Sequence, residues 1–249
     1  MLKMDREKEI LHALEGMGCV SVHELSEKLY TSESTIRRIL GSLEHRGLIR
    51  RTYGGAELIE KHTHASVFSD RFRENMVSKQ EIARKAAAIV PEGSTVFLDQ
   101  SSTSYFLAAE LAKKKQLTIV TNNIEIASLL AQTDLEVYVC GGQLSREIRM
   151  CLIGEDAKRL FLNMNADFVF FSAHSLSEDG IISDWNREET GVREAMMINA
   201  ACKVFLCDSS KFGSRSRYHQ CALADLDILI SEGNNARQFA HCSDTLKLL

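Results

Sequence analysis

The sequence has little of what disulfide-bonded, membrane-spanning or fibrous proteins require. Its 249 residues include one proline and are only 7% aromatic, and no apolar run approaches the roughly 20 residues that cross a bilayer. The seven cysteines are an odd number with no C-x-x-C pair, which in a chain of this length indicates reduced, mostly buried thiols. What is present, 45% hydrophobic and 26% charged residues, is the composition of a folded globular protein.

The chain also has no large excess of one charge, because 30 lysines and arginines oppose 34 acidic residues for a net charge of −4. That total conceals a local asymmetry. Residues 32–56 hold five arginines against two glutamates, whereas residues 57–249 hold 21 basic and 26 acidic side chains. Charged residues dominate the first nine positions, where a signal peptide needs an apolar stretch, so we expect a cytoplasmic protein that binds no membrane.

Residues 5–56 have the pattern of three short helices followed by a β-hairpin. Apolar side chains recur at helical spacing in three successive stretches. These are Ile10, Leu11, Leu14 and Met17; Val22, Leu25 and Leu29; and Ile36, Ile39, Leu40 and Leu43. The run 48–53 then leads into Gly54 and Gly55, which suits a hairpin with a glycine tip. This order predicts a winged helix-turn-helix domain over residues 1–56.

The third helix and the wing carry the residues that we expect to contact DNA. Arg37 and Arg38 lie opposite the apolar stripe of the helix, where guanidinium groups can reach base edges or phosphates in a major groove. Hydroxyl side chains at the start of the helix add phosphate ligands. The candidate DNA-binding residues are Ser32, Ser34, Thr35, Arg37, Arg38, Arg50, Arg51 and Tyr53. Five arginines on this pattern favour double-stranded DNA as a partner over a merely solvated surface.

After a polar stretch at residues 57–74, interpreted as a linker, short apolar strands alternate with amphipathic helices through residues 75–249. We expect helices at 78–90, 105–114, 124–131, 156–162 and 187–201, and strands at 95–98, 117–120, 136–139, 168–171, 204–206 and 228–230. Such alternation is typical of an α/β domain with a mainly parallel sheet. Ligands of these sheets bind at the carboxyl ends of the strands.

Four polar or glycine-rich loops follow predicted strands and indicate one ligand pocket at that edge. The loop 99–103 places small hydroxyl residues at a helix N-terminus, which suits a phosphate, although an ordinary helix cap has the same pattern. Lys211 would add a compact cation for a phosphate or a hydroxyl group. The candidate effector-binding residues are Asp99, Ser101, Ser102, Thr103, Thr121, Asn122, Gly141, Gly142, Asp208 and Lys211.

Specific motifs run through nearly the whole chain. In the N-terminal part they are Val20-Ser21-Val22-His23-Glu24-Leu25, Ser34-Thr35-Ile36-Arg37-Arg38, Gly47, Leu48, Arg50 and Gly54-Gly55-Ala56. In the C-terminal part, residues 99–103, 121–122, 141–142 and 208–213 are similar to the motifs D-x-G-S-T, T-N, G-G and D-x-S-K-F-G. With these motifs the chain resembles the DeoR family of bacterial transcription regulators.

The resemblance implies an effector-controlled regulator, usually a repressor, that binds operator DNA and senses a phosphorylated sugar or a related metabolite. The implied sensor fold is shared with ribose-5-phosphate isomerase and the glucosamine-phosphate deaminases. The implied ligand residues are Ser101, Ser102, Thr103, Asn122 and Lys211. We also expect a homo-oligomer formed through the C-terminal domain, because pairing two half-sites raises affinity and specificity. No cofactor is expected.

Three departures from the family pattern bear on specificity. Ile39 stands where the family usually has Asp after the two arginines, which affects operator preference more than DNA binding itself. Ser101 stands where glycine is usual, and residues 172–176 lack the glycines usual after that strand. We therefore expect a ligand that differs in size from the common ones or binds weakly.

Two other classes of function stay open at this point. A sugar-phosphate isomerase or deaminase-like enzyme with an accessory N-terminal domain would need a placed carboxylate base. Asp99 and Asp208 could serve, but after Phe171 no carboxylate occurs before Glu178, so no catalytic residue is assigned. An RNA-binding or protein-interaction module would fit scattered basic charge or exposed aromatics better than a compact, arginine-bearing helix and wing.

The remaining clusters of polar residues are given no ligand. Each of the segments 62–64 and 219–221 holds only one pair of metal-ligand residue types without a second pair at zinc-like spacing, so no metal is expected. Glu188 and Glu189 lie near Arg187 and Arg193 on a predicted helix, and this group is interpreted as a solvated ion-pair face rather than as an effector contact.

Overall fold

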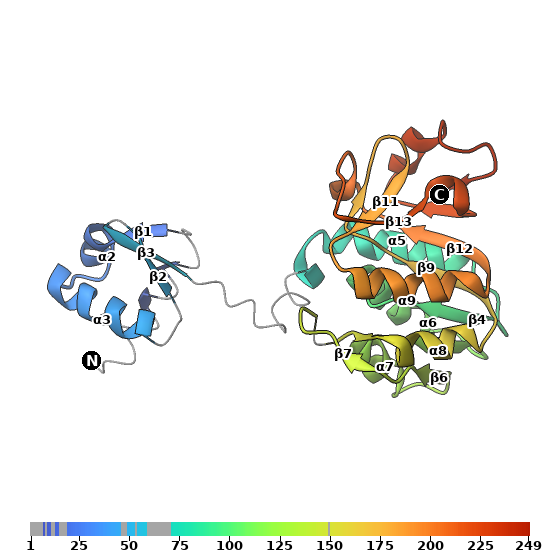
Figure 1. The fold of residues 1–249 in the computed structure, drawn as a ribbon, viewed down its shortest axis with the longest axis horizontal. Helices are drawn as coiled ribbons and strands as arrows, with labels where there is room; N and C mark the ends of the chain where they lie inside the picture. The colour runs from blue at the N-terminus through green and yellow to red at the C-terminus, as the bar shows by residue number, and fades with distance from the viewer. Residues whose placement is uncertain are drawn as a thin grey trace. The chain divides into compact units, whose positions relative to one another are not determined.

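The computed structural model describes residues 7, 9–10, 13–14, 19–45, 49–52, 54–58, 71–148 and 150–249 (Figure 1). The chain divides into two compact units, residues 1–63 and 64–249, which are described separately. The division falls within the segment 57–74 that the sequence predicts to be a linker, and the limits of that linker stay a prediction. None of the described helices is long and apolar enough to cross a membrane.

The first unit combines helices with a three-stranded antiparallel sheet. Its named elements are β1 (Cys19–Ser21), α2 (Val22–Lys28), α3 (Glu33–His45), β2 (Ile49–Thr52) and β3 (Gly55–Leu58), and residues 7, 9–10 and 13–14 are also helical. The strand order is β1-β3-β2, so β2 and β3 form the wing that the sequence predicts. The sequence does not predict β1, which pairs with the other edge of β3.

The apolar positions of the three helical stretches meet in one core. Ile10, Leu14, Leu25 and Leu40 are fully buried in it. Ile39 is buried with them, so the position that departs from the family pattern is a packing position in this chain. An acidic side chain there would be buried without solvation and would destabilise this small domain, whose core contains few residues.

The junction of β1, α2 and the wing is fixed by local contacts. Ser21 caps α2, because its Oγ accepts a hydrogen bond from the Glu24 N–H at 3.2 Å while the Glu24 carboxylate accepts from the Ser21 N–H at 2.9 Å. Opposite Ser21 in the sheet lies Gly55. A Cβ at Gly55 would lie 2.3 Å from the carbonyl oxygen of Val20, so the close approach of β1 and β3 requires glycine.

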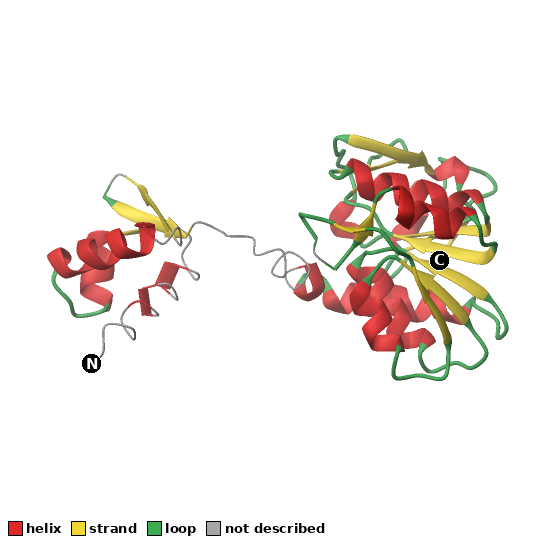
Figure 2. Ribbon diagram, turned by 60° about the horizontal axis from the view of Figure 1, so that its bottom comes forward, coloured by secondary structure: helices red, strands yellow, loops and turns green. Residues whose placement is uncertain are grey.

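The second unit is an α/β domain built on a seven-stranded parallel sheet of order β15-β14-β12-β9-β4-β5-β6 (Figure 2). The strands are β4 (Thr95–Leu98), β5 (Thr118–Thr121), β6 (Glu136–Val139), β9 (Ala166–Phe171), β12 (Ala200–Leu206), β14 (Ile228–Ile230) and β15 (Lys247–Leu248). The helices are α5 (Met76–Ala88), α6 (Ser102–Leu111), α7 (Ile124–Leu130), α8 (Glu155–Leu162) and α9 (Arg187–Ile198), with 3-10 turns η1 (Ser209–Lys211), η2 (Leu223–Asp225) and η3 (Asn235–Phe239). The predicted mainly parallel α/β architecture is confirmed.

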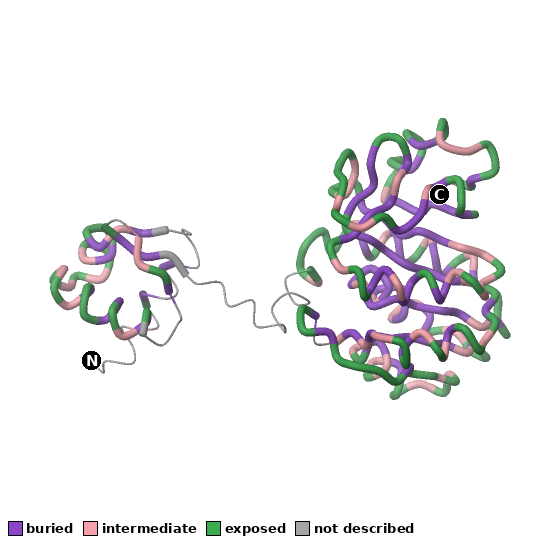
Figure 3. Tube along the Cα trace, in the orientation of Figure 1, coloured by how far each residue is buried: buried purple, intermediate pink, exposed green. Residues whose placement is uncertain are grey.

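Helices cover both faces of this sheet (Figure 2), whose strands are largely buried (Figure 3), and the inner strand β4 supplies side chains to a core on each face. Val96 and Leu98 of β4 pack with the residues of α5, α6 and α7, whereas Phe97 packs with those of α8 and α9. Successive side chains of a strand point to opposite faces, which explains this division. Burial on both faces also explains why the strands read as continuous apolar runs.

Smaller antiparallel pairings complete the second unit. β10 (Ser175–Leu176), β11 (Ile181–Asp184) and β13 (Tyr218–Ala222) form a three-stranded sheet, and β7 (Gln143–Leu144) pairs with β8 (Leu152–Ile153). The sequence does not predict these strands, because they mix polar and apolar residues and do not form the continuous apolar runs of the parallel strands.

Side-chain caps begin two helices directly after their strands. Ser101 Oγ accepts from the Ser104 N–H at 3.1 Å, which starts α6 three residues before the predicted position. Asn123 Oδ1 accepts from the Glu125 N–H at 2.8 Å and starts α7. The N-termini of both helices therefore lie at the carboxyl edge of the sheet, where a ligand is expected.

Candidate DNA-binding surface and ligand cavity

Helix α3 exposes both arginines of its motif. The Arg37 guanidinium pairs with the Glu33 carboxylate at 2.6 Å, one turn earlier in the helix. Arg38 is exposed and forms no ion pair with a described residue. Glu33 therefore offsets the charge of Arg37, while the charge of Arg38 is fully available to an anionic partner.

The hydroxyl residues form a cluster at the start of α3. Ser32 Oγ lies 3.1 Å from Ser34 Oγ and 3.0 Å from Thr35 Oγ1. Ser32 and Ser34 are exposed, and Thr35 is half-buried. Exposed hydroxyls next to a helix N-terminus suit a phosphate oxygen.

The wing places one predicted arginine outward and one partly inward. Arg50 on β2 is exposed, whereas Arg51 is half-buried and its Nε has no hydrogen-bond partner in the described structure. Tyr53 lies outside the described residues. The contacts of all three residues with DNA stay predictions.

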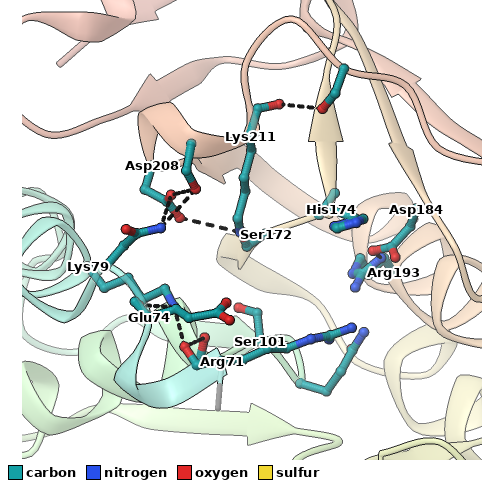
Figure 4. Close-up of a pocket in the computed structure, with 16 residues that line it drawn as sticks. Arg71, Glu74, Lys79, Ser101, Ser172, His174, Asp184, Arg193, Asp208 and Lys211 are labelled. Carbon is teal, nitrogen blue, oxygen red and sulfur yellow. Dashed lines mark hydrogen bonds and ion pairs between the residues drawn. The ribbon is translucent and has the colours of Figure 1, made fainter. Parts of the chain in front are cut away.

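A cavity of about 200 Å³ lies in the second unit beside the loops that follow β4, β9 and β12 (Figure 4). Residues of α5, of α9 and of the segment before α5 complete its walls. The lining consists of Arg71, Glu74, Asn75, Lys79, Gln100, Ser101, Ser102, Ser172, Ala173, His174, Asp184, Arg193, Asp208, Ser210, Lys211 and Ser214. Nearly all are polar or charged, so the cavity suits a hydrophilic ligand.

The structure brings together four of the ten residues that the sequence assigns to an effector. The four that line the cavity are Ser101, Ser102, Asp208 and Lys211. The six that do not line it are Asp99, Thr103, Thr121, Asn122, Gly141 and Gly142. Asp99, Thr103, Thr121 and Asn122 are completely buried behind the wall, and the two glycines are exposed elsewhere.

Two of the residues outside the cavity, Asn122 and Gly142, have structural contacts that account for their types. Asn122 Nδ2 donates to the Leu152 carbonyl at 3.1 Å and to Gln100 Oε1 at 3.2 Å. Gly142 has a φ of +119°, and a Cβ there would lie 2.6 Å from the Ile153 carbonyl oxygen. These motif residues hold the loops in place.

Asp99 is the centre of a buried hydrogen-bond network directly behind the cavity wall. Its Oδ1 accepts from the Ser101 N–H at 3.1 Å and from the hydroxyls of Ser101 and Ser104, both at 2.6 Å. Its Oδ2 accepts from the Ser172 N–H at 3.2 Å and from Arg193 Nε at 3.0 Å. Asp99 thus joins the loops after β4 and β9 to α9 and fixes the shape of the cavity.

Arg193 and Glu189 are buried, so the prediction of a solvated ion-pair face is wrong for them. Arg193 Nη1 donates to Asp184 Oδ2 at 2.8 Å, and its Nη2 lies 3.7 Å from Glu189 Oε2. Burial acts to lower the pKa of Arg193, but the carboxylates of Asp184, Asp99 and Glu189 outweigh it and raise that pKa. Burial raises the pKa of Glu189 despite the nearby guanidinium. Helix α9 carries these groups on its inner face because the buried carboxylates require a cation.

Among the described residues, four cations line the cavity, namely Arg193, which is paired with buried carboxylates, and three others. Arg71, Lys79 and Lys211 all line it, and Lys79 is only 3% exposed. Lys211 Nζ donates to Ser172 Oγ at 2.8 Å and lies 3.7 Å from Asp208 Oδ2. Burial, followed by the positive charge of Lys211, lowers the pKa of Lys79 to about 8. This concentration of positive charge suits an anion.

Hydrogen-bonding groups for hydroxyls line another part of the cavity. Asp184 and Asp208 are buried carboxylates, and His174 lies nearby with a pKa that burial lowers. The ring centroid of His174 lies 5.7 Å from that of Trp185, the one tryptophan of the chain, which is 56% exposed. Neutral histidine and carboxylates can bind the hydroxyls of a polyol.

Most residues of the lining are not predicted from the sequence, among them Arg71, Asn75 and Lys79, although Lys79 carries a visible signal. Lys79 falls on the apolar stripe of its helix, at helical spacing from Ile82 and Ala83, where an uncompensated cation calls for a partner. Arg71 and Asn75 carry no such signal, because they precede the helix and reach the cavity only through the tertiary fold.

The fold and the two sites define a class, namely a DNA-binding transcription regulator that joins a winged helix-turn-helix to an α/β sensor domain. Comparison with known proteins agrees. Residues 6–62 match the DeoR-like helix-turn-helix domain, and residues 74–233 match the DeoR C terminal sensor domain. The chain belongs to the DeoR family of transcription regulators.

Individual relatives cover nearly the whole chain. The HTH-type transcriptional regulator GlpR of Haloferax volcanii is 32% identical over 233 residues, covering 94% of this chain and 91% of that protein. The glycerol-3-phosphate regulon repressor of Escherichia coli is 30% identical over 233 residues, covering 93% and 92%. Among solved structures, ribose 5 phosphate isomerase A from Neisseria gonorrhoeae is 19% identical with a TM-score of 0.41, covering 55% of this chain and 53% of that chain.

Proposed function

We propose that the protein is a repressor whose affinity for operator DNA is controlled by a phosphorylated sugar or a related anionic metabolite. The cavity carries this proposal, because it places Arg71, Lys79 and Lys211 beside buried carboxylates and a histidine. Cations suit the phosphate, and the carboxylates and histidine suit the hydroxyls. A volume of about 200 Å³ favours a small sugar phosphate over a nucleotide.

The phosphate is proposed to lie where α6 begins. The first N–H groups of a helix have no intrahelical partner and carry the positive end of the helix dipole. Ser101 and Ser102 line the cavity at this helix start, and Lys211 approaches from the loop after β12. An effector that favours one arrangement of the protein changes its affinity for operator DNA. Operator DNA must then change the affinity for the effector by the same factor.

On the DNA side, α3 is proposed to enter the major groove with Arg38 available for base edges or phosphates. The hydroxyl cluster at Ser32 and the wing arginines Arg50 and Arg51 would hold the phosphate backbone. Two copies of this reader bind two half-sites if the protein is a homo-oligomer, and we propose that the second unit forms that assembly.

Catalysis is not part of the proposal. Asp99, which the sequence offers as a base, is fully buried and already accepts five hydrogen bonds. Asp208, the other base that the sequence offers, accepts hydrogen bonds from Asn75 and Ser210 and lies 3.7 Å from Lys211 Nζ. Asp184 is paired with Arg193, whose charge helps to lower the pKa of that carboxyl despite burial. A carboxylate held in this way is a poor proton acceptor for isomerisation or deamination.

One experiment tests the proposal. Binding of the full chain to its own upstream DNA is measured by gel shift against a panel of sugar phosphates, and the same panel is assayed for turnover. Quenching of Trp185 fluorescence reports entry into the cavity, since its ring contacts His174. We expect selective DNA binding that one ligand changes, without turnover. Absence of selective DNA binding at moderate salt would contradict the proposal, and turnover would favour the isomerase-like alternative.

Two variants separate the sites. Arg38→Ala should weaken operator binding and leave the ligand-induced fluorescence change intact, whereas Lys211→Met should do the reverse. Lys113→Met is the control, because Lys113 is exposed and pairs only with Glu110 in the described structure.

A further inference from the structure

The segment 71–75 forms one wall of the ligand cavity and is the first described part of the second unit after the connection from the DNA-binding unit (Figure 4). Three separate elements hold it. Lys79 Nζ on α5 donates to the backbone carbonyls of Arg71 and of Glu74, the latter at 2.7 Å. Ser102 Oγ on α6 donates to the same Arg71 carbonyl at 3.3 Å.

Asn75 supplies the third attachment. It occupies the N-cap position of α5 with a left-handed φ of +50°, yet its side chain makes no cap hydrogen bond. Its Nδ2 instead donates to Asp208 Oδ1 at 3.1 Å and to Ser210 Oγ at 2.8 Å, across the cavity mouth on the loop after β12. An Asn cap normally stabilises its own helix, so these long-range contacts replace a local stabilisation.

Lys79 is a buried cation without a carboxylate within ion-pair distance among the described residues. An ammonium group has three N–H donors, and two of them are used by the backbone carbonyls. The third donor is available to the cavity that Lys79 lines. Arg71 and Lys211 add like charges nearby, which disfavour the protonated form of Lys79 until an anion arrives.

We propose that an anion bound in the cavity holds the segment 71–75 closed over the anion, so that ligand binding and the order of this segment, which precedes α5, are linked. The anion accepts a hydrogen bond from the third N–H of Lys79 and pairs with the guanidinium of Arg71. It keeps Lys79 protonated, preserves both carbonyl hydrogen bonds and relieves repulsion among the three cations. This inference rests on the proposed function of the cavity as the effector site and adds the route by which the effector acts.

Hydrogen–deuterium exchange of the full chain tests this closure. Peptides spanning 71–82 are followed with and without saturating inorganic phosphate, at constant ionic strength set with chloride. We expect phosphate to slow backbone exchange in this segment by about threefold or more, because the closed segment opens less often. In Lys79→Met, exchange should be faster than in the unaltered protein and no longer respond to phosphate.

Lys85→Met is the matched control. Lys85 lies on the same helix and also donates to two backbone carbonyls, of Ser231 at 2.8 Å and Gly233 at 2.7 Å, but it does not line the cavity. This variant should keep the phosphate response. If Lys79→Met does not fold, Asn75→Asp provides a second test, since it places a carboxylate against Asp208 and should open the segment while Lys79 remains.

The outcomes separate this inference from the proposed function. Phosphate binding seen by Trp185 fluorescence, with unchanged exchange at 71–82, would overturn the closure and leave the effector site standing. No response to phosphate or to any sugar phosphate would overturn both. A gel shift completes the test: the effector found on the panel should change operator binding of the Lys85→Met protein, and an equal change with Asn75→Asp would refute the proposed route.

Discussion

Arg193 Nε donates to Asp99 Oδ2 at 3.0 Å, although both side chains are buried. Through this bond α9 is joined to the loop that begins α6 and to the loop after β9, because Asp99 also accepts from Ser101 and Ser172. Buried charged groups therefore fix the wall of the cavity that the loops after β4 and β9 form. Another wall, the segment 71–75, is held by backbone carbonyls and one asparagine side chain.

Arg193→Met should lower the free energy of unfolding of the second unit by about 3 to 5 kcal/mol, because it leaves three buried carboxylates without their cation. Denaturant unfolding followed by circular dichroism measures the change. Arg159→Met is the control, since Arg159 is exposed and pairs with Asp156 at 3.4 Å, so its loss should cost less than about 1 kcal/mol. Equal effects of the two substitutions would contradict the role of Arg193.

Affinity of the cavity for phosphate should fall as pH rises through about 8. Binding of an anion favours protonated Lys79, whose pKa burial lowers to about 8, so the ligand must supply the free energy of proton uptake above that pH. The loss should reach about tenfold between about pH 7 and about pH 9. Burial lowers the pKa of His174, so that residue stays neutral over this range. Calorimetric titration measures the slope. The second ionisation of phosphate contributes equally to both proteins, so the difference in slope between the unaltered protein and Lys79→Met isolates the contribution of Lys79.

Arg38→Ala should weaken operator binding by about 1 to 3 kcal/mol and lower the salt dependence by about one counterion. Arg37→Ala should have a smaller effect, because the Arg37 guanidinium is already paired with Glu33 at 2.6 Å. Fluorescence anisotropy on operator DNA at several salt concentrations measures both quantities. A larger loss with Arg37→Ala would show that the exposed, unpaired position is not the dominant contact.

Gly55→Ala should destabilise the first unit by about 1 to 3 kcal/mol or more, because the new Cβ would lie 2.3 Å from the Val20 carbonyl oxygen. DNA binding should be lost while the Trp185 response to ligand persists. Gly41→Ala is the opposite control: it has no neighbour within 4 Å and lies in α3, so alanine should stabilise that helix by about 0.5 to 1 kcal/mol. Thermal unfolding of both variants measures the difference, and equal stability would contradict this account of the wing.

The strands and helices were predictable wherever periodicity and caps are local. Strands Glu136–Val139 and Ile228–Ile230 occur as expected, and the apolar stripe of α3 is buried as expected. Helix α6 begins three residues before the predicted start. The hydroxyl run 101–104 is typical of a loop, and only the structure shows that Ser101 Oγ accepts from the Ser104 N–H and caps the helix. The short antiparallel strands are not predicted, because their mixed polar and apolar residues do not form the apolar runs that mark the parallel strands.

The candidate site was predictable only in part. The motifs at 99–103 and 208–213 identify two loops that do meet at the cavity, but they do not say which of their side chains face it. Asp99 faces inward to Arg193, while Ser101 and Ser102 of the same loop line the cavity. That choice depends on the direction of each side chain at the end of a strand, which a single motif does not encode.

By itself, the sequence determined the two-part organisation, the winged helix and the parallel α/β sheet, because these follow from local periodicity, turn residues and the distribution of arginines. Only the tertiary structure decided that Arg193 is buried and that Asn75 and Lys79 belong to the ligand cavity. Asn75 meets Asp208 across 133 positions of chain. Such pairs are brought together by the packing of whole elements, so their chemistry appears only once the sheet and its helices are assembled.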